Sequence, residues 1–134
     1  MKKINAIIER SADGNCTIYC ENEMFSGVGN SPETAKADML FQMNLFKETA
    51  IEKGFNYPEW LNDAFEVVYK FDTKSLLEYY AGVITPAALE RLSGIHQKQL
   101  WNYMHGHSKP RKQQVEKIER ALHSLGSELI SIAL

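Results

Sequence analysis

The sequence predicts an α+β protein in which a small domain with a β-sheet precedes a domain built only from helices. Two observations support this prediction. Up to residue 71, short stretches alternate apolar and polar side chains, as strands do, and one long stretch between them has helical spacing. Beyond residue 72 every apolar pattern is helical. The predicted domains are therefore residues 1–71, in the order β-β-β-α-β, and residues 72–134.

The first strands come from residues 4–8 and 16–20, where every second side chain is apolar. The segment SADGN between them offers Asp13 and Gly14 for a turn that needs positive φ, which predicts an antiparallel pair. The glycine-rich segment FSGVGN follows as a short third strand or a loop.

The long helix is expected to begin after Ser31, a good N-cap, with Pro32 at its first position and Gly54 as its stop. Its apolar stripe should cover the sheet. The stripe comprises Ala35, Met39, Met43, Phe46 and Ala50. An irregular connection, anchored by Trp60, leads to the last strand at residues 65–71.

Four helices are predicted in the second domain, at about residues 74–81, 85–94, 96–106 and 110–126. Glycine is expected to end the last of them at Gly126, and residues 127–134 leave helix and strand both open. Apolar residues of this last helix recur at heptad-like spacing, at Val115, Ile118, Leu122 and Leu125.

Composition is that of an ordinary globular chain, with 44% apolar and 24% charged residues. Glu9 and Arg10 interrupt the N-terminal apolar run, so we expect neither a signal peptide nor a membrane partner, but a cytoplasmic protein. Cys16 and Cys20 would lie about 13 Å apart on one strand face, too far for a disulfide. Both are expected to be buried thiols.

Charge is distributed unevenly over the two predicted domains. Residues 1–71 hold 7 Lys and Arg against 11 Asp and Glu, whereas residues 72–134 hold 8 against 6. Between Arg91 and Arg120 there are seven basic residues and two acidic ones. A local positive field on a small helical domain is typical of a DNA-binding protein.

The segment ALERLSGIHQKQLWNYMHG has the pattern of a helix-turn-helix, with Gly94 in the turn. Leu89, Ile95, Leu100 and Tyr103 supply the buried side chains. The outer face of the second helix then presents the predicted base-reading residues Gln97, Lys98 and Asn102.

Four residues are expected to meet the DNA backbone rather than base edges: Gln99, Lys109, Arg111 and Lys112. For Trp101, on the outer face, two interpretations stay open: stacking on sugar or a thymine methyl, or burial against the first domain or a second subunit. One such module contacts too few base pairs to be specific alone, so we expect a homodimer on a two-fold operator in double-stranded DNA.

Residues 74–126 resemble the phage-repressor (Xre/Cro) helix-turn-helix family, with landmarks at Gly94, Gly106, Pro110 and the closing ALHSLG. The resemblance implies that outer residues near the start of the recognition helix read bases. One departure is Glu90, where the family usually has a small residue. A charged side chain there predicts looser or shifted packing between the two helices.

The N-terminal half, with MKKINAIIERSADGNCTIYCEN and the helix start SPETAKA, resembles the HicB antitoxin family. The resemblance implies a truncated RNase H-like fold in residues 1–71. It also implies an antitoxin that neutralises a small basic HicA-like toxin, an mRNA-cleaving ribonuclease, and represses its own operon. Glu9, Glu21 and Glu23 are the acidic residues expected to face the toxin.

Two alternatives remain beside the antitoxin. One is a stand-alone transcriptional regulator whose first domain dimerises or senses a ligand. The other is a degenerate nuclease, which would need converging carboxylates, and for which Glu9, Asp13, Glu21 and Glu23 are candidates in name only. We expect no catalytic residues and no cofactor. We also expect no metal, because the histidines lack metal-ligand spacing.

Overall fold

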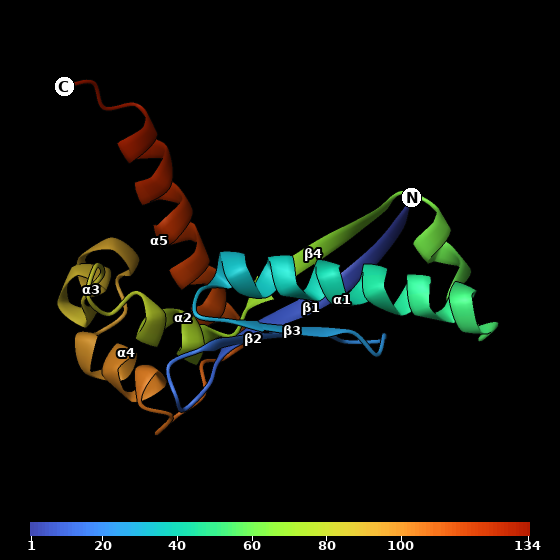
Figure 1. Cartoon of the computed structure of the whole chain (residues 1–134). Helices are drawn as coiled ribbons and strands as arrows, with labels where there is room; N and C mark the ends of the chain where they lie inside the picture. Colours follow the sequence, from blue (N-terminus) through green and yellow to red (C-terminus); the bar gives the residue numbers. More distant parts are fainter. The chain divides into compact units, whose positions relative to one another are not determined.

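The computed structural model describes all 134 residues and divides into two compact units, Met1–Asp72 and Thr73–Leu134. The predicted boundary after residue 71 lies one residue from this division. A four-stranded mixed sheet and five α-helices make the protein α+β, as predicted. Figure 1 shows the sheet with its helix in the first unit and the short helices of the second.

Unit 1, Met1–Asp72, is built on a sheet with the strand order β3-β2-β1-β4. The strands β1 and β2 pair antiparallel, β2 and β3 likewise, and β4 runs parallel to β1. The strand β3 is therefore one edge of the sheet. The bounds of the strands are Lys2–Arg10 for β1, Cys16–Cys20 for β2, Ser26–Gly29 for β3 and Phe65–Phe71 for β4.

The β1–β2 hairpin differs from the expectation at one residue of its turn. Gly14 has the positive φ, +87°, but Asp13 does not, so that part of the prediction is wrong. The Asp13 carboxylate instead accepts hydrogen bonds from the backbone N–H of Asn15, at 3.0 Å, and from its side-chain amide. Such a side-chain turn fixes the hairpin without strain at a non-glycine residue.

Helix α1, Pro32–Lys53, begins and ends as predicted. Ser31 caps it in a reciprocal capping box with Thr34, and Gly54 closes it with φ +73°. Its buried side chains pack on one sheet face together with every second residue of β1 and β2, including both cysteines, which are free thiols. Desolvation by burial raises the pKa of Cys16 and of Cys20, so both thiols favour the protonated form.

Close approach of α1 to β3 depends on two strand glycines. A Cβ at Gly27 would overlap the carbonyl oxygen of Ala35 and lie 2.5 Å from the backbone nitrogen of Met39. A Cβ at Gly29 would likewise meet the backbone at Ala35, 2.6 Å from its nitrogen. The helix backbone therefore lies directly on the edge strand.

The irregular connection contains a short 3-10 helix, η1 (Glu59–Asn62), held by aromatic packing. The Trp60 ring meets Phe25 and Phe65 edge-on, with centroids 5.9 and 5.1 Å apart. Trp60 thus anchors the connection, as predicted.

Unit 2, Thr73–Leu134, consists of four α-helices around one apolar core. Their bounds are Thr73–Tyr79 for α2, Pro86–Ser93 for α3, Gln97–Met104 for α4 and Lys112–Ile130 for α5. The predicted stop at Gly126 is wrong, because α5 continues through it to Ile130. No helix of the chain is both long enough and apolar enough to cross a membrane.

Candidate functional sites

The helix pair α3–α4 is joined by a tight turn and packed through four buried side chains. Gly94 makes the turn with φ +77°, and Thr85 caps α3 through Ala88 N–H. His96 caps α4, with Nδ1 accepting from Lys98 N–H at 3.1 Å. The four predicted core residues of the pair are all buried: Leu89, Ile95, Leu100 and Tyr103.

Glu90 links the two helices instead of loosening them. Its Oε1 accepts a hydrogen bond of 2.8 Å from the backbone N–H of Gln97, the first residue of α4. The looser packing expected from Glu90 is therefore wrong. A carboxylate at a helix N-terminus satisfies a free N–H group and complements the helix dipole, so it fixes the start of α4.

The outer face of α4 carries some of the predicted base-reading residues but not all. Gln97 and Lys98 are exposed in the first turn, whereas Asn102 is half-buried. Trp101, four residues after Gln97, occupies the middle of the exposed face and is 45% exposed. The exposed face therefore centres on Trp101, with Asn102 at its margin.

Trp101 stacks with two histidines at the end of α4. Its ring centroid lies 3.9 Å from that of His105 and 5.3 Å from that of His107, with nearly parallel planes. The His105 ring nitrogen Nδ1 is also 2.9 Å from the carbonyl oxygen of Trp101. The indole is therefore held at the surface in one orientation, a role that sequence reasoning left open.

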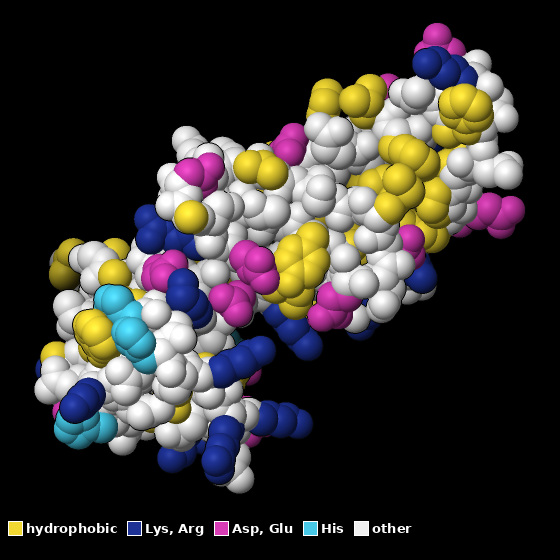
Figure 2. All heavy atoms as spheres, turned by 90° about the horizontal axis from the view of Figure 1, so that it is seen from below, with side chains coloured by type: hydrophobic (Ala, Val, Ile, Leu, Met, Phe, Trp, Pro, Cys, Tyr) yellow, Lys and Arg dark blue, Asp and Glu magenta, His cyan; other side chains and the backbone are white.

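A polar groove of about 780 Å³ lies between α4 and the start of α5. Its lining includes Lys109, Arg111 and Lys117 and contains no acidic residue. Gln99, half-buried, donates to Ser108 at 3.3 Å inside it. Lys112, the first residue of α5, is exposed. In Figure 2 the His side chains, which all belong to unit 2, mark an end of the surface where Lys and Arg side chains also lie.

The first turn of α5 adds to the positive potential of this groove. Arg111 occupies the N-cap position without a side-chain cap, and no acidic residue lies in the first turn. The free N–H groups and the positive end of the helix dipole make such a terminus suitable for an anion, above all a phosphate. Three of the four predicted backbone contacts, Gln99, Lys109 and Arg111, line this groove.

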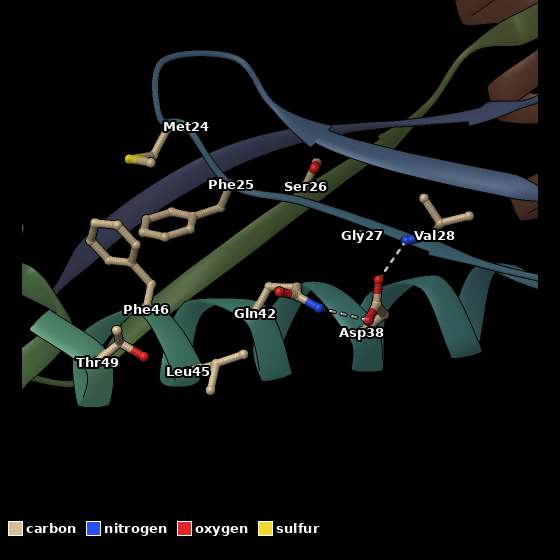
Figure 3. Close-up of a pocket in the computed structure, with 10 residues that line it drawn as sticks. All are labelled: Met24, Phe25, Ser26, Gly27, Val28, Asp38, Gln42, Leu45, Phe46 and Thr49. Carbon is tan, nitrogen blue, oxygen red and sulfur yellow. Dashed lines mark hydrogen bonds between the residues drawn. The ribbon is translucent and has the colours of Figure 1, made fainter.

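Unit 1 has a different groove, of about 470 Å³, between the edge strand β3 and α1. Figure 3 shows the side chains of Met24, Val28 and Leu45 around it, all three exposed. Asp38 Oδ2 accepts a hydrogen bond of 2.8 Å from Val28 N–H, and Gln42 donates to Oδ1 at 3.4 Å. The sequence contained a clue to this groove, because Leu45 falls outside the helix stripe that covers the sheet.

The three predicted toxin-facing glutamates do not form one cluster of free carboxylates. Glu9 Oε1 accepts from the Tyr19 hydroxyl at 2.9 Å, and this bond raises the pKa of Tyr19. Glu23 pairs with Lys2 at 3.8 Å, and Glu21 is exposed. Both Glu21 and Glu23 lie in the β2–β3 loop, directly before Met24 of the groove.

Carboxylates, histidines and cysteines form no group of three or more that could hold a metal ion. Asp13, in its hairpin turn, bonds to Asn15. Comparison with known proteins gave no match to a family model, a curated protein or a solved structure.

Proposed function

We propose that this protein is a sequence-specific DNA-binding repressor in which α3, the turn at Gly94 and α4 act as a helix-turn-helix. One observation supports this function best: the exposed polar first turn of α4, with Gln97 and Lys98, adjoins a basic groove at the N-terminus of α5. Gln97 and Lys98 offer the hydrogen-bonding groups that distinguish adenine and guanine in the major groove. The groove supplies cations and N–H donors for the phosphates beside it.

Rigidity favours base reading by α4. His96 and Glu90 fix its first turn, and Leu100 and Tyr103 bury its inner face. A recognition helix held in this way pays little conformational entropy on binding. Trp101, held by His105, offers an apolar ring to a thymine methyl group or a sugar.

The test is selection of DNA from a random duplex library by the full-length protein, followed by titration of the selected site at several salt concentrations. We expect a two-fold related site and steep salt dependence. Replacing Arg111 and Lys112 by Ala should lower the salt slope by about one unit each and weaken all sequences alike. Matched variants are Glu116→Ala and Glu119→Ala on α5, which should not lower the slope. A protein that enriches no sequence contradicts the proposal.

For unit 1 we propose binding of a small basic protein, which makes the whole chain an antitoxin of a type II toxin–antitoxin pair that resembles the HicB family. The supporting observation is the groove of Figure 3, where exposed apolar side chains adjoin acidic residues. Apolar contacts would supply affinity, and Glu21 and Glu23 would steer a basic partner. The partner expected from the resemblance is a HicA-like ribonuclease toxin.

The second part is tested by asking whether the adjacent gene encodes a small basic protein and, where it does, by co-expressing that protein with this chain. We expect the full-length protein to restore growth and to form a complex. Leu45→Glu should weaken that complex at least tenfold, whereas Glu48→Gln, also exposed on α1, should not. A toxic neighbour that does not bind this chain contradicts the antitoxin. DNA binding without any such neighbour favours the stand-alone regulator instead.

A further inference from the structure

Trp101 places a large apolar ring among the polar groups of the exposed face of α4. It is 45% exposed, whereas Leu100 and Tyr103 on the inner side of the helix are buried. With 3.6 residues per turn, the Trp101 side chain leaves the helix in a direction between those of Gln97 and Lys98. The ring therefore shares the surface that is proposed to read bases.

The Trp101 ring is ordered before any ligand binds. His105 stacks on it with ring centroids 3.9 Å apart and planes 23° apart, and His105 Nδ1 lies 2.9 Å from the carbonyl oxygen of Trp101. His107 adds a second nearly parallel ring at 5.3 Å. A ring held in one orientation loses little conformational freedom on binding, so it can select a small group at a fixed position.

The ring lies outside the basic groove that is proposed to meet phosphates. Gln99 and Tyr103 belong to the lining of that groove, and Trp101 does not. Each of them is two residues from Trp101, which places them about 160° around the helix from it. The Trp101 ring therefore faces away from the phosphates that this groove would hold.

We propose that Trp101 contacts the C5 methyl group of a pyrimidine in the major groove. The donors and acceptors that base pairs present there are polar, and the thymine methyl is the apolar group among them. Contact between this methyl and an indole removes apolar surface of both from water. The protein then distinguishes thymine from uracil, and 5-methylcytosine from cytosine, at one position in each half-site. The inference rests on the proposed DNA binding and names the chemical group that one side chain of α4 reads.

The test uses the DNA site selected from the random library and the full-length protein. Replacing its thymines by deoxyuridine, one position of the half-site at a time, removes only the C5 methyl group. We expect one position at which the uracil duplex binds about fourfold more weakly for each methyl group removed. At that position a duplex with 5-methylcytosine should bind about fourfold more tightly than one with cytosine. Fluorescence anisotropy measures all four duplexes.

Protein variants then assign the methyl contact to Trp101. Trp101→Ala should bind the thymine and uracil duplexes equally, because the methyl group has lost its partner. Trp101→Phe keeps an apolar ring and should retain a preference for thymine. Lys112→Ala is the matched control, which should weaken both duplexes and leave their ratio unchanged. Circular dichroism checks that the variants are folded, and the uracil substitution tests the wild type independently of them.

Two outcomes overturn the methyl contact: a wild type that binds every uracil duplex as tightly as the thymine duplex, or a preference for thymine that survives in Trp101→Ala. If the wild type has no preference and Trp101→Ala weakens both duplexes by the same factor, the ring stacks on a sugar instead. A library from which no sequence is enriched refutes the proposed DNA binding, and this inference with it. An enriched site without any uracil effect refutes the methyl contact alone.

Discussion

Two carboxylates, one in each unit, have the same local task in different surroundings. Asp38 reaches from α1 to the N–H of Val28 on β3, and Glu90 reaches from α3 to the N–H of Gln97 on α4, both at 2.8 Å. Each bond satisfies a backbone donor at the border of a candidate binding surface. The two bonds differ in where the N–H group lies: one belongs to an edge strand and the other to the start of a helix.

At β3, the satisfied donor belongs to the exposed edge of a sheet. An uncovered edge strand pairs with other strands, so Asp38 protects this edge and leaves the side chains of the groove as the contact surface. At α4, the donor belongs to a helix terminus, and Glu90 fixes the direction in which the helix leaves its turn. The bond in unit 1 therefore covers a donor at the sheet edge, and the bond in unit 2 fixes the start of α4.

The largest expected effect comes from the close contact between α1 and β3 at Gly27, which brings Asp38 next to the N–H of Val28. Gly27→Ala places a Cβ against the backbone of α1, which cannot move aside as a side chain can. We expect a loss of about 3 kcal/mol in the free energy of unfolding of unit 1. Gly82→Ala is the control, because its Cβ meets nothing within 4 Å. Amide hydrogen exchange should show protection lost in β1 and β2 but kept in α4, and equal loss in both units contradicts the prediction.

A second effect concerns the base reading that is proposed for α4. Gln97→Ala should weaken the selected DNA site by about 1–3 kcal/mol while leaving binding to unrelated DNA unchanged. Gln113→Ala, a change of the same type in the groove lining, should lack this selectivity. Fluorescence anisotropy with selected and scrambled duplexes measures the ratio. If Gln97→Ala weakens both duplexes alike, α4 is not the recognition helix.

Asp38 and Glu90 also show which features of the fold could not be predicted from the sequence. Local patterns predicted the strands, the cap at Ser31 and the turn at Gly94, because each depends on neighbours along the chain. The roles of Asp38 and Glu90 depend on the distance between elements, which no local pattern contains. The predicted helix stop at Gly126 was wrong although a local rule supported it. Glycine commonly ends a helix, but the apolar residues beyond Gly126 continue the helical stripe.

The residues of α4 likewise divide into those whose positions could be predicted from the sequence and those whose positions could not. Gln97 and Lys98 lie on the predicted exposed face because helical periodicity places them there, opposite Leu100. The margin position of Asn102 and the stack of Trp101 on His105 could not be predicted, since both depend on how the segment after α4 folds back. The backbone N–H of His107 donates to Asn102 O at 2.9 Å in that segment.

A third effect, on the fixed helix itself, should be smaller. Glu90→Ala removes the acceptor of Gln97 N–H and should cost about 1–2 kcal/mol in the free energy of unfolding of unit 2. Glu90→Gln keeps an acceptor oxygen without the charge, so about half of that loss is expected. Chemical denaturation followed by circular dichroism measures both variants. Identical losses would mean that the charge, rather than the hydrogen bond, accounts for the whole effect.

The smallest effect on stability, and the most informative for unit 1, is expected from Asp38→Ala. Val28 N–H lies at an exposed edge, where water can replace the lost acceptor, so the free energy of unfolding should fall by less than about 1 kcal/mol. The uncovered edge should nevertheless pair with other chains, and the weight-average mass in light scattering should rise above that of the wild type. Asp38→Asn retains an acceptor oxygen and is the control that should stay at the wild-type mass. An Asp38→Ala protein with unchanged mass would show that the edge is protected by something other than this carboxylate, and the contrast between Asp38 and Glu90 would then be one of geometry alone.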